Sequence, residues 1–184
     1  MSRFSHRFSG SLKAGFFLYA LLLLLSAAAC SSGPETDKGK FRELSRQAEA
    51  LRASLKDGAT YQQFSAALQK FSADIAVLRG RVATREEKDL LDAYSDLLAI
   101  YQDGAVLWRY QSEFARFGFV PKDRIYVGQD VDPIVFKYRF VTESHMYQPT
   151  RQFWKSIPAD SIRIIWGNAD SQIKMIENMM KYEG

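Results

Sequence analysis

Residues 84–117 read TREEKDLLDAYSDLLAIYQDGAVLWRYQSEFARF and carry the longest helical pattern in the chain. Thr84 and Glu87 form a capping-box pair that marks the start of this helix, and Gly118 and Pro121 are stop signals beyond its end. At 1.5 Å per residue, such a helix is about 50 Å long. Its apolar residues recur at alternating spacings of three and four, which defines one helix face: Leu91, Tyr94, Leu98, Tyr101, Ala105 and Trp108.

Three further stretches repeat this spacing. They cover residues 41–55, which end before Gly58, residues 61–78, and residues 162–180. The second stretch is opened by Thr60 with a glutamine three residues later, which is again a capping-box pair. Short connections follow the first two stretches and force neighbouring helices to run in opposite directions. The sequence therefore predicts an all-α fold, an antiparallel four-helix bundle, as a single domain over residues 41–184.

An aromatic-rich segment, residues 119–157, separates the third helix from the last, and we expect it to be an irregular insertion. Within it, Asp132-Pro133 has the form of a helix start, because proline is favoured at the first helical position. The alternation in IVFKYRF, residues 134–140, fits a strand nearly as well, so residues 132–142 stay open between a short helix and a strand. Residues 124–127 are expected to be briefly extended.

The first 29 residues have the layout of a secretory signal peptide. A basic stretch ends at Lys13, and an uncharged run of 16 residues, AGFFLYALLLLLSAAA, leads directly to Cys30. A membrane-spanning helix needs about 20 apolar residues, so a cleaved leader is the better interpretation. The polar stretch SSGPETDKGK, residues 31–40, then has the composition of a flexible tether.

The stretch LSAAAC, residues 25–30, resembles the lipobox of bacterial lipoproteins, although Ala27 stands where that class usually has leucine. The resemblance implies cleavage before Cys30, acyl chains such as palmitate on its thiol and new amino group, and attachment to a membrane of the cell envelope. Ser31 stands where lipoproteins kept in an inner membrane often carry aspartate. The resemblance therefore favours the outer membrane facing the periplasm, with the inner membrane as the open alternative.

The charge pattern argues against nucleic acid as a partner. The net charge is +4, but the leader holds three of the 25 basic residues and none of the 21 acidic ones. Residues 30–184 therefore carry 22 basic and 21 acidic side chains, a net charge of +1. Binding to nucleic acid requires a sustained basic patch, which a nearly neutral body lacks.

Residue types that support catalysis or a cofactor are scarce. His145 is the single histidine after the leader, so histidine-carboxylate di-iron sites, haem attachment and zinc clusters are not supported. The Ser-x-x-Lys spacing at Ser171 and Lys174 lacks the companion motifs of the hydrolases that use it. We expect no cofactor, no metal and no enzymatic activity.

Most aromatic residues after the leader lie between Tyr101 and Trp166. Those in the irregular segment are the candidate binding surface, because loops carry function more often than packed seams: Tyr126, Tyr147, Arg151 and Trp154. The leading expectation is a non-catalytic binding or accessory lipoprotein with a protein partner in the envelope. In size, anchor and helicity the chain resembles pilotins, small lipoproteins that hold a segment of a secretion channel subunit. The alternative expectation is a glycan or peptidoglycan binder.

Overall fold

The computed structural model describes residues 35–116, 118 and 120–181, and the chain from Thr36 onward forms one compact unit. The predicted signal peptide and Cys30 lie outside the described residues. Among the described helices, none combines the length and the apolar character that crossing a membrane requires. The elements in chain order are η1 (Lys38–Phe41), α2 (Arg42–Lys56), α3 (Tyr61–Arg79), α4 (Arg85–Phe114), β1 (Arg124–Tyr126), α5 (Asp132–Tyr138), β2 (Glu143–Tyr147), β3 (Gln152–Pro158) and α6 (Ser161–Lys181).

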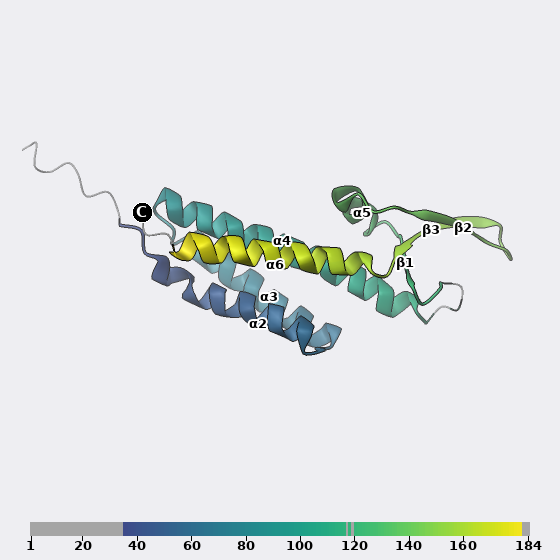
Figure 1. Cartoon of the computed structure of the whole chain (residues 1–184), viewed down its shortest axis with the longest axis horizontal. Coiled ribbons are helices and arrows are strands. Elements are labelled where there is room, and N and C mark those ends of the chain that lie inside the picture. The colour runs from purple at the N-terminus through teal and green to yellow at the C-terminus, as the bar shows by residue number, and fades with distance from the viewer. Residues whose placement is uncertain (1–34, 117, 119, 182–184) are drawn as a thin grey trace, which may run out of the picture. The chain divides into compact units, whose positions relative to one another are not determined.

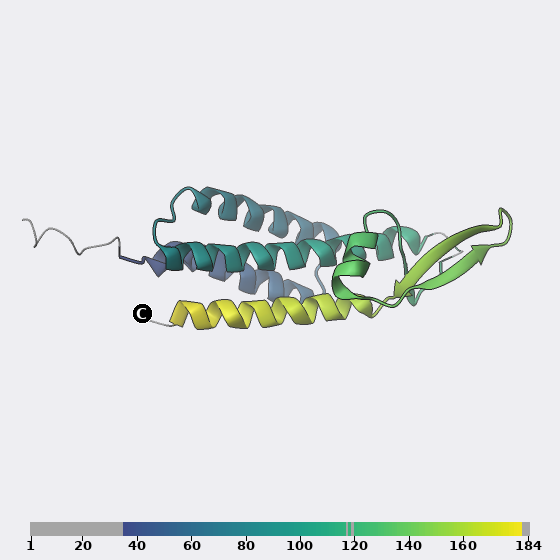
Figure 2. The same ribbon diagram turned by 90° about the horizontal axis from the view of Figure 1, so that it is seen from above.

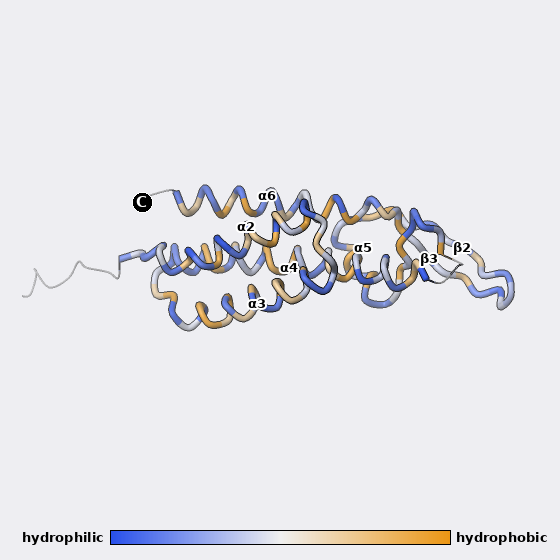
Figure 3. Tube along the Cα trace, turned by 90° about the horizontal axis from the view of Figure 1, so that it is seen from below, coloured by the Kyte–Doolittle hydropathy of each residue, from blue (hydrophilic) through white to orange (hydrophobic). Residues whose placement is uncertain are grey.

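The four long helices α2, α3, α4 and α6 pack with alternating directions, and α4 lies between α3 and α6 (Figures 1 and 2). Polar and apolar residues alternate turn by turn along these helices (Figure 3), as the sequence spacing predicts. We call their shared interior the helical core. Its largest fully buried side chains are Phe41, Leu44, Leu51, Phe64, Phe71, Tyr94, Leu97 and Tyr101.

Local signals predicted the helix ends well. Thr60 and Thr84 each accept a hydrogen bond from the backbone N–H of the residue three positions later, and both capping boxes are complete. Gly58 has a φ of +74°, the left-handed conformation that glycine adopts without strain after a helix. Helix α4 ends at Phe114, a few residues before the predicted stop.

The prediction of an irregular insertion is wrong, because this segment contains a three-stranded antiparallel sheet in the order β1-β3-β2. The fold is therefore mostly helical, which roughly supports the predicted all-α class, but it is not a strict four-helix bundle. The extended piece expected at residues 124–127 is strand β1, which covers residues 124–126. Of the two alternatives left open for residues 132–142, the structure shows a short helix, α5, over residues 132–138. Strands β2 and β3 were missed because most of their residues are exposed, so they show no period of alternating burial that a sequence pattern could reveal.

A second apolar cluster joins the sheet to the helices. We call it the sheet core, and it combines β1, β3 and α5 with the second half of α4 and the start of α6. Its buried members are Leu107, Ile125, Val127, Val131, Ile134, Ile157 and Ile165. Trp166 packs against both cores, so the two clusters are linked through α4 and α6. The sheet is thereby held at the C-terminal half of α4 (Figure 2).

Candidate binding surface

The two faces of the sheet differ in character, as the strand register shows. His145 pairs with Trp154, and Tyr126 pairs with Ser156. Because side chains alternate between faces along a strand, Tyr126, His145, Tyr147 and Trp154 share one face. Three of the four predicted binding residues are therefore brought to one surface.

The rings on this face stack against one another and against α4, and we call the set the aromatic ladder. Tyr110 and Phe114 of α4 are 5.2 Å apart between ring centroids, and Phe114 is 4.6 Å from Tyr126. Tyr126 is 6.1 Å from Trp154, and Trp154 is 4.2 Å from His145. All four pairs are near parallel, with interplanar angles of 30° or less.

This stacking gives the aromatic ladder a structural role. Offset stacking stabilises aromatic pairs beyond the area they bury, and here it ties β1, β2 and β3 to α4. A sugar ring that stacks on an aromatic side chain needs an exposed ring face. In the ladder, neighbouring rings occupy those faces, so Tyr126 and Trp154 are poorly placed to stack on a glycan.

Two of the predicted residues, Tyr147 and Arg151, are outside the ladder and lie at the far end of the hairpin. Tyr147 is 40 % exposed, and Arg151, the last residue of the turn, has a φ of 57°. The N–H of Arg151 donates to the carbonyl oxygen of Tyr147 at 2.8 Å, which closes this turn. The turn is hydrophilic (Figure 3), so it is a polar tip rather than a continuation of the aromatic ladder.

The opposite face of the hairpin exposes apolar side chains that sequence reasoning missed. Met146 and Phe153 are direct cross-strand partners and are 42 % and 77 % exposed. Phe136 of α5 and Val141 after it are 87 % and 78 % exposed. We call Met146 and Phe153 the hairpin apolar face. Only the register reveals it, because Phe153 stands beside Trp154 in the sequence but points to the other side of the sheet.

Among the residues that the structure describes, the arrangement nearest to a catalytic pair is that of His145 and Ser156. The Nε2 atom of His145 lies 2.8 Å from Oγ of Ser156. Ser156 is completely buried, so a substrate could not reach its hydroxyl without rearrangement. Within the described residues, no carboxylate is hydrogen bonded to His145, and no group of three or more potential metal ligands gathers. The pair satisfies a buried hydroxyl between β2 and β3.

At the other end of α4, the start of the compact unit is fixed by Glu87. Its buried carboxylate accepts hydrogen bonds from the N–H of Ala83 at 2.7 Å, the N–H of Asp37 at 2.9 Å and Nζ of Lys40 at 2.8 Å. Burial raises the pKa of Glu87, but these donors outweigh it and lower the pKa to about 2. Residues 36–40, expected to belong to the tether, are therefore bonded to the helices.

Comparison with known proteins adds no assignment: no protein-family model, curated protein or solved structure matches this chain.

Proposed function

We propose that this chain is a lipid-anchored, non-catalytic binding protein of the bacterial cell envelope. The anchor is the acylated Cys30 that the leader implies, and the partner is another envelope protein. The proposal rests on one structural observation above all, the exposure of Met146 and Phe153 as a cross-strand apolar pair. Exposed apolar groups that gather on a rigid element mark protein contact sites more often than scattered ones do.

The position of this pair suits such a role. Thr36 contacts Thr84, next to the first residue of α4, whereas β1 packs on the C-terminal half of the same helix. The 30 residues of α4 span about 45 Å at 1.5 Å per residue. A partner bound at the hairpin would therefore contact the end of the compact unit that lies away from its entry point. An accessory or pilotin-like role is consistent with this arrangement.

The anchor is tested by growing cells with labelled palmitate. Wild-type protein should incorporate the label and stay with the membranes, whereas a Cys30→Ser chain should not be labelled. If both forms carried the label, or neither did, the lipoprotein assignment would be wrong. Fractionation of inner and outer membranes then tests the expected outer-membrane location.

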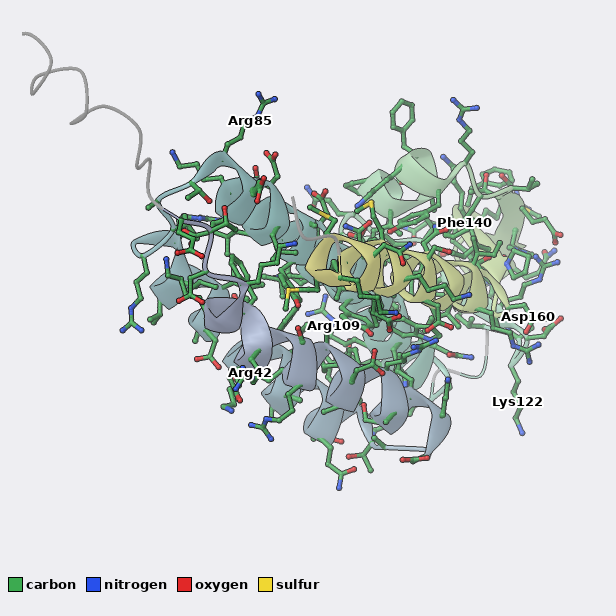
Figure 4. The ribbon with its side chains drawn as sticks, turned by 60° about the vertical axis from the view of Figure 1, so that its left-hand side comes forward. Arg42, Arg85, Arg109, Lys122, Phe140 and Asp160 are labelled. Atoms are coloured by element: carbon green, nitrogen blue, oxygen red, sulfur yellow. The ribbon has the colours of Figure 1, made fainter. Side chains whose placement is uncertain are left out.

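The binding surface is tested by photo-crosslinking in cells. A photoreactive residue replaces Phe153 in one strain and Lys122 in another, since Lys122 is exposed and extends outward before β1 (Figure 4). We expect one discrete crosslinked protein from position 153 and none from position 122. The same products from both positions, or none from position 153, would contradict binding at the hairpin apolar face.

Glycan binding is the alternative proposal, and it depends on residues outside the aromatic ladder. Tyr147 and Arg151, at the polar tip, are the exposed groups that could contact a sugar or an anionic polymer. A double Tyr147→Ala, Arg151→Ala variant should keep its helix content and lose retention on insoluble peptidoglycan if this alternative holds. Equal retention of both proteins would exclude the tip as a glycan site.

A further inference from the structure

A pocket of about 290 Å³ opens between α2, α4 and α6, away from the sheet. Most of its lining is apolar and comes from Ala48, Ile173, Ile176 and Met180. Its volume is just below the range typical of ligand sites, which begins at about 300 Å³. A slender ligand fits such a space better than a bulky one.

The two hydroxyl groups in the pocket lining are paired with each other. The hydroxyl groups of Ser45 and Tyr94 lie 2.5 Å apart and form a hydrogen bond. Burial raises the pKa of Tyr94, so its phenol stays neutral near pH 7. A mostly apolar site whose hydroxyl groups already bond each other favours a hydrocarbon over a polar ligand or a cluster of ordered waters.

The charged residues around the pocket determine which polar end group of a ligand is favoured. Glu49, Glu177 and Lys181 line it, and Arg52 pairs with both glutamates, at 3.6 Å and 4.0 Å. Arg52 also bonds Asp170 at 2.9 Å, so its single guanidinium group is shared by three carboxylates. A ligand that ends in a carboxylate would add a fourth negative charge, whereas an ester or amide would add none.

The place of the pocket in the fold brings it close to the start of the compact unit. Nζ of Lys38 donates to the carbonyl oxygen of Met179 at 2.8 Å, and Met179 is the neighbour of Met180 in the pocket lining. Thr36 is six positions after Cys30 in the sequence, which limits the reach of this segment to roughly 20 Å. An acyl chain attached to Cys30 would therefore start within this distance of Thr36, at the end of the compact unit where the pocket opens.

We propose that this pocket binds a fatty acyl chain through its hydrocarbon, with an uncharged ester or amide linkage at the mouth. An acyl chain of Cys30 is the nearest source in the sequence, so the inference deepens the proposed function and rests on the lipid anchor. A chain in the pocket is withdrawn from the bilayer. The remaining acyl chains then carry the attachment, which requires at least two of them for stability.

Binding is measured on the chain from residue 30 onward carrying Cys30→Ser, so that no attached lipid competes. The probes are 1-monopalmitoylglycerol and palmitate, added below their micelle concentrations, and the readout is methyl NMR of the methionine and isoleucine side chains. We expect Met180, Ile173 and Ile176 to shift with the glycerol ester and to respond more weakly to palmitate. Equal affinity for both probes would overturn the choice of an uncharged linkage, and no shift at these methyl groups would overturn the site.

A matched pair of variants on α6 tests the location. Met180→Glu places a carboxylate in the lining, whereas Met175→Glu places one at an exposed position, 44 % accessible, outside the pocket lining. Met180→Glu should weaken binding of the ester by more than about tenfold, because an unpaired carboxylate is costly to bury. Met175→Glu should bind as the parent does. If Met180→Glu disturbs folding, Ala48→Leu serves as the pocket-filling variant, with the exposed Ala66→Leu as its control.

The source of the acyl chain is tested in cells fed a diazirine-labelled fatty acid. After illumination, a crosslink between the Cys30 lipid and the peptide from α6 that contains Met180 would identify the anchor as the occupant. Crosslinks of that peptide to phospholipid alone would overturn the assignment to Cys30. Acylated Cys30 without any crosslink to α6 would contradict the pocket while the anchor stands, and Cys30 without a label would contradict the proposed function itself.

Discussion

At the scale of single residues, Glu87 does more than cap a helix. The carboxylate closes the capping box of α4 and also receives Lys40 and the N–H of Asp37, so one buried group holds the start of the compact unit. Glu87→Gln replaces one acceptor oxygen by an NH₂ group that faces donors. We expect a loss of about 2 kcal/mol in the free energy of unfolding, measured with urea at pH 7. Glu86→Gln at the neighbouring exposed position should leave it unchanged.

The same carboxylate makes the free energy of unfolding depend on pH. The pKa of Glu87 falls from its ordinary 4.5 to about 2 in the folded protein, so the unfolded chain binds the proton more readily. Its contribution is complete above about pH 4.5 and is lost as the pH falls towards 2. Urea midpoints from pH 6 to pH 2.5 should fall less steeply for Glu87→Gln than for the parent. Parallel curves would show that Glu87 is not the group that titrates.

At the scale of the helices, α4 and α6 meet where a glycine accepts a tryptophan ring. A Cβ atom added at Gly104 would lie 2.1 Å from the ring of Trp166. Gly104→Ala should therefore cost about 1–3 kcal/mol through overpacking, despite the higher helix propensity of alanine. Gly167, in α6, has nothing within 4 Å of such a Cβ, so Gly167→Ala should stabilise by up to about 1 kcal/mol. Thermal unfolding of the two variants compares them directly.

Ring stacking in the aromatic ladder attaches the strands to α4. Trp154→Ala removes stacking with both Tyr126 and His145, which we expect to destabilise the sheet by about 1 kcal/mol or more. Backbone amides of β2 and β3 should then exchange faster, while those of α3 keep their protection. Phe153→Ala, at the adjacent exposed position, serves as the control and should leave exchange unchanged. Unchanged exchange in Trp154→Ala would remove the structural role assigned to the ladder.

The elements also show what a sequence pattern can and cannot reveal. Helices α3 and α4 were predictable because capping residues mark their starts and one apolar face packs against a shared core. Strands β2 and β3 were not, since pairing with each other satisfies their backbone while most of their side chains remain exposed. The residues of the candidate binding surface were also difficult to predict from the sequence. Trp154 was predicted to belong to a binding surface, and the structure shows that it stacks within the ladder. Phe153 was overlooked because only the strand register places the two side chains on opposite faces.

At the scale of the whole molecule, the helical core and the sheet core are built on the same two helices. Helices α4 and α6 contribute to both, and Trp166 packs against each of them. Opening either core would therefore expose apolar surface of the other. We expect the compact unit to unfold as one cooperative body rather than as a helical part and a separate sheet.

Fluorine NMR of fluorotryptophan tests this expectation separately in the helical core, the aromatic ladder and the junction between the two cores. Trp108 reports on the helical core, Trp154 on the aromatic ladder and Trp166 on the junction between the cores. The native signals of all three should vanish at the same urea concentration. Ile165→Ala, a fully buried change in the sheet core, should lower the three midpoints together and cost about 2–5 kcal/mol. A native Trp108 signal that survives after that of Trp154 is lost would instead show that the sheet opens independently, and a partner bound at the hairpin would then be coupled to that local opening.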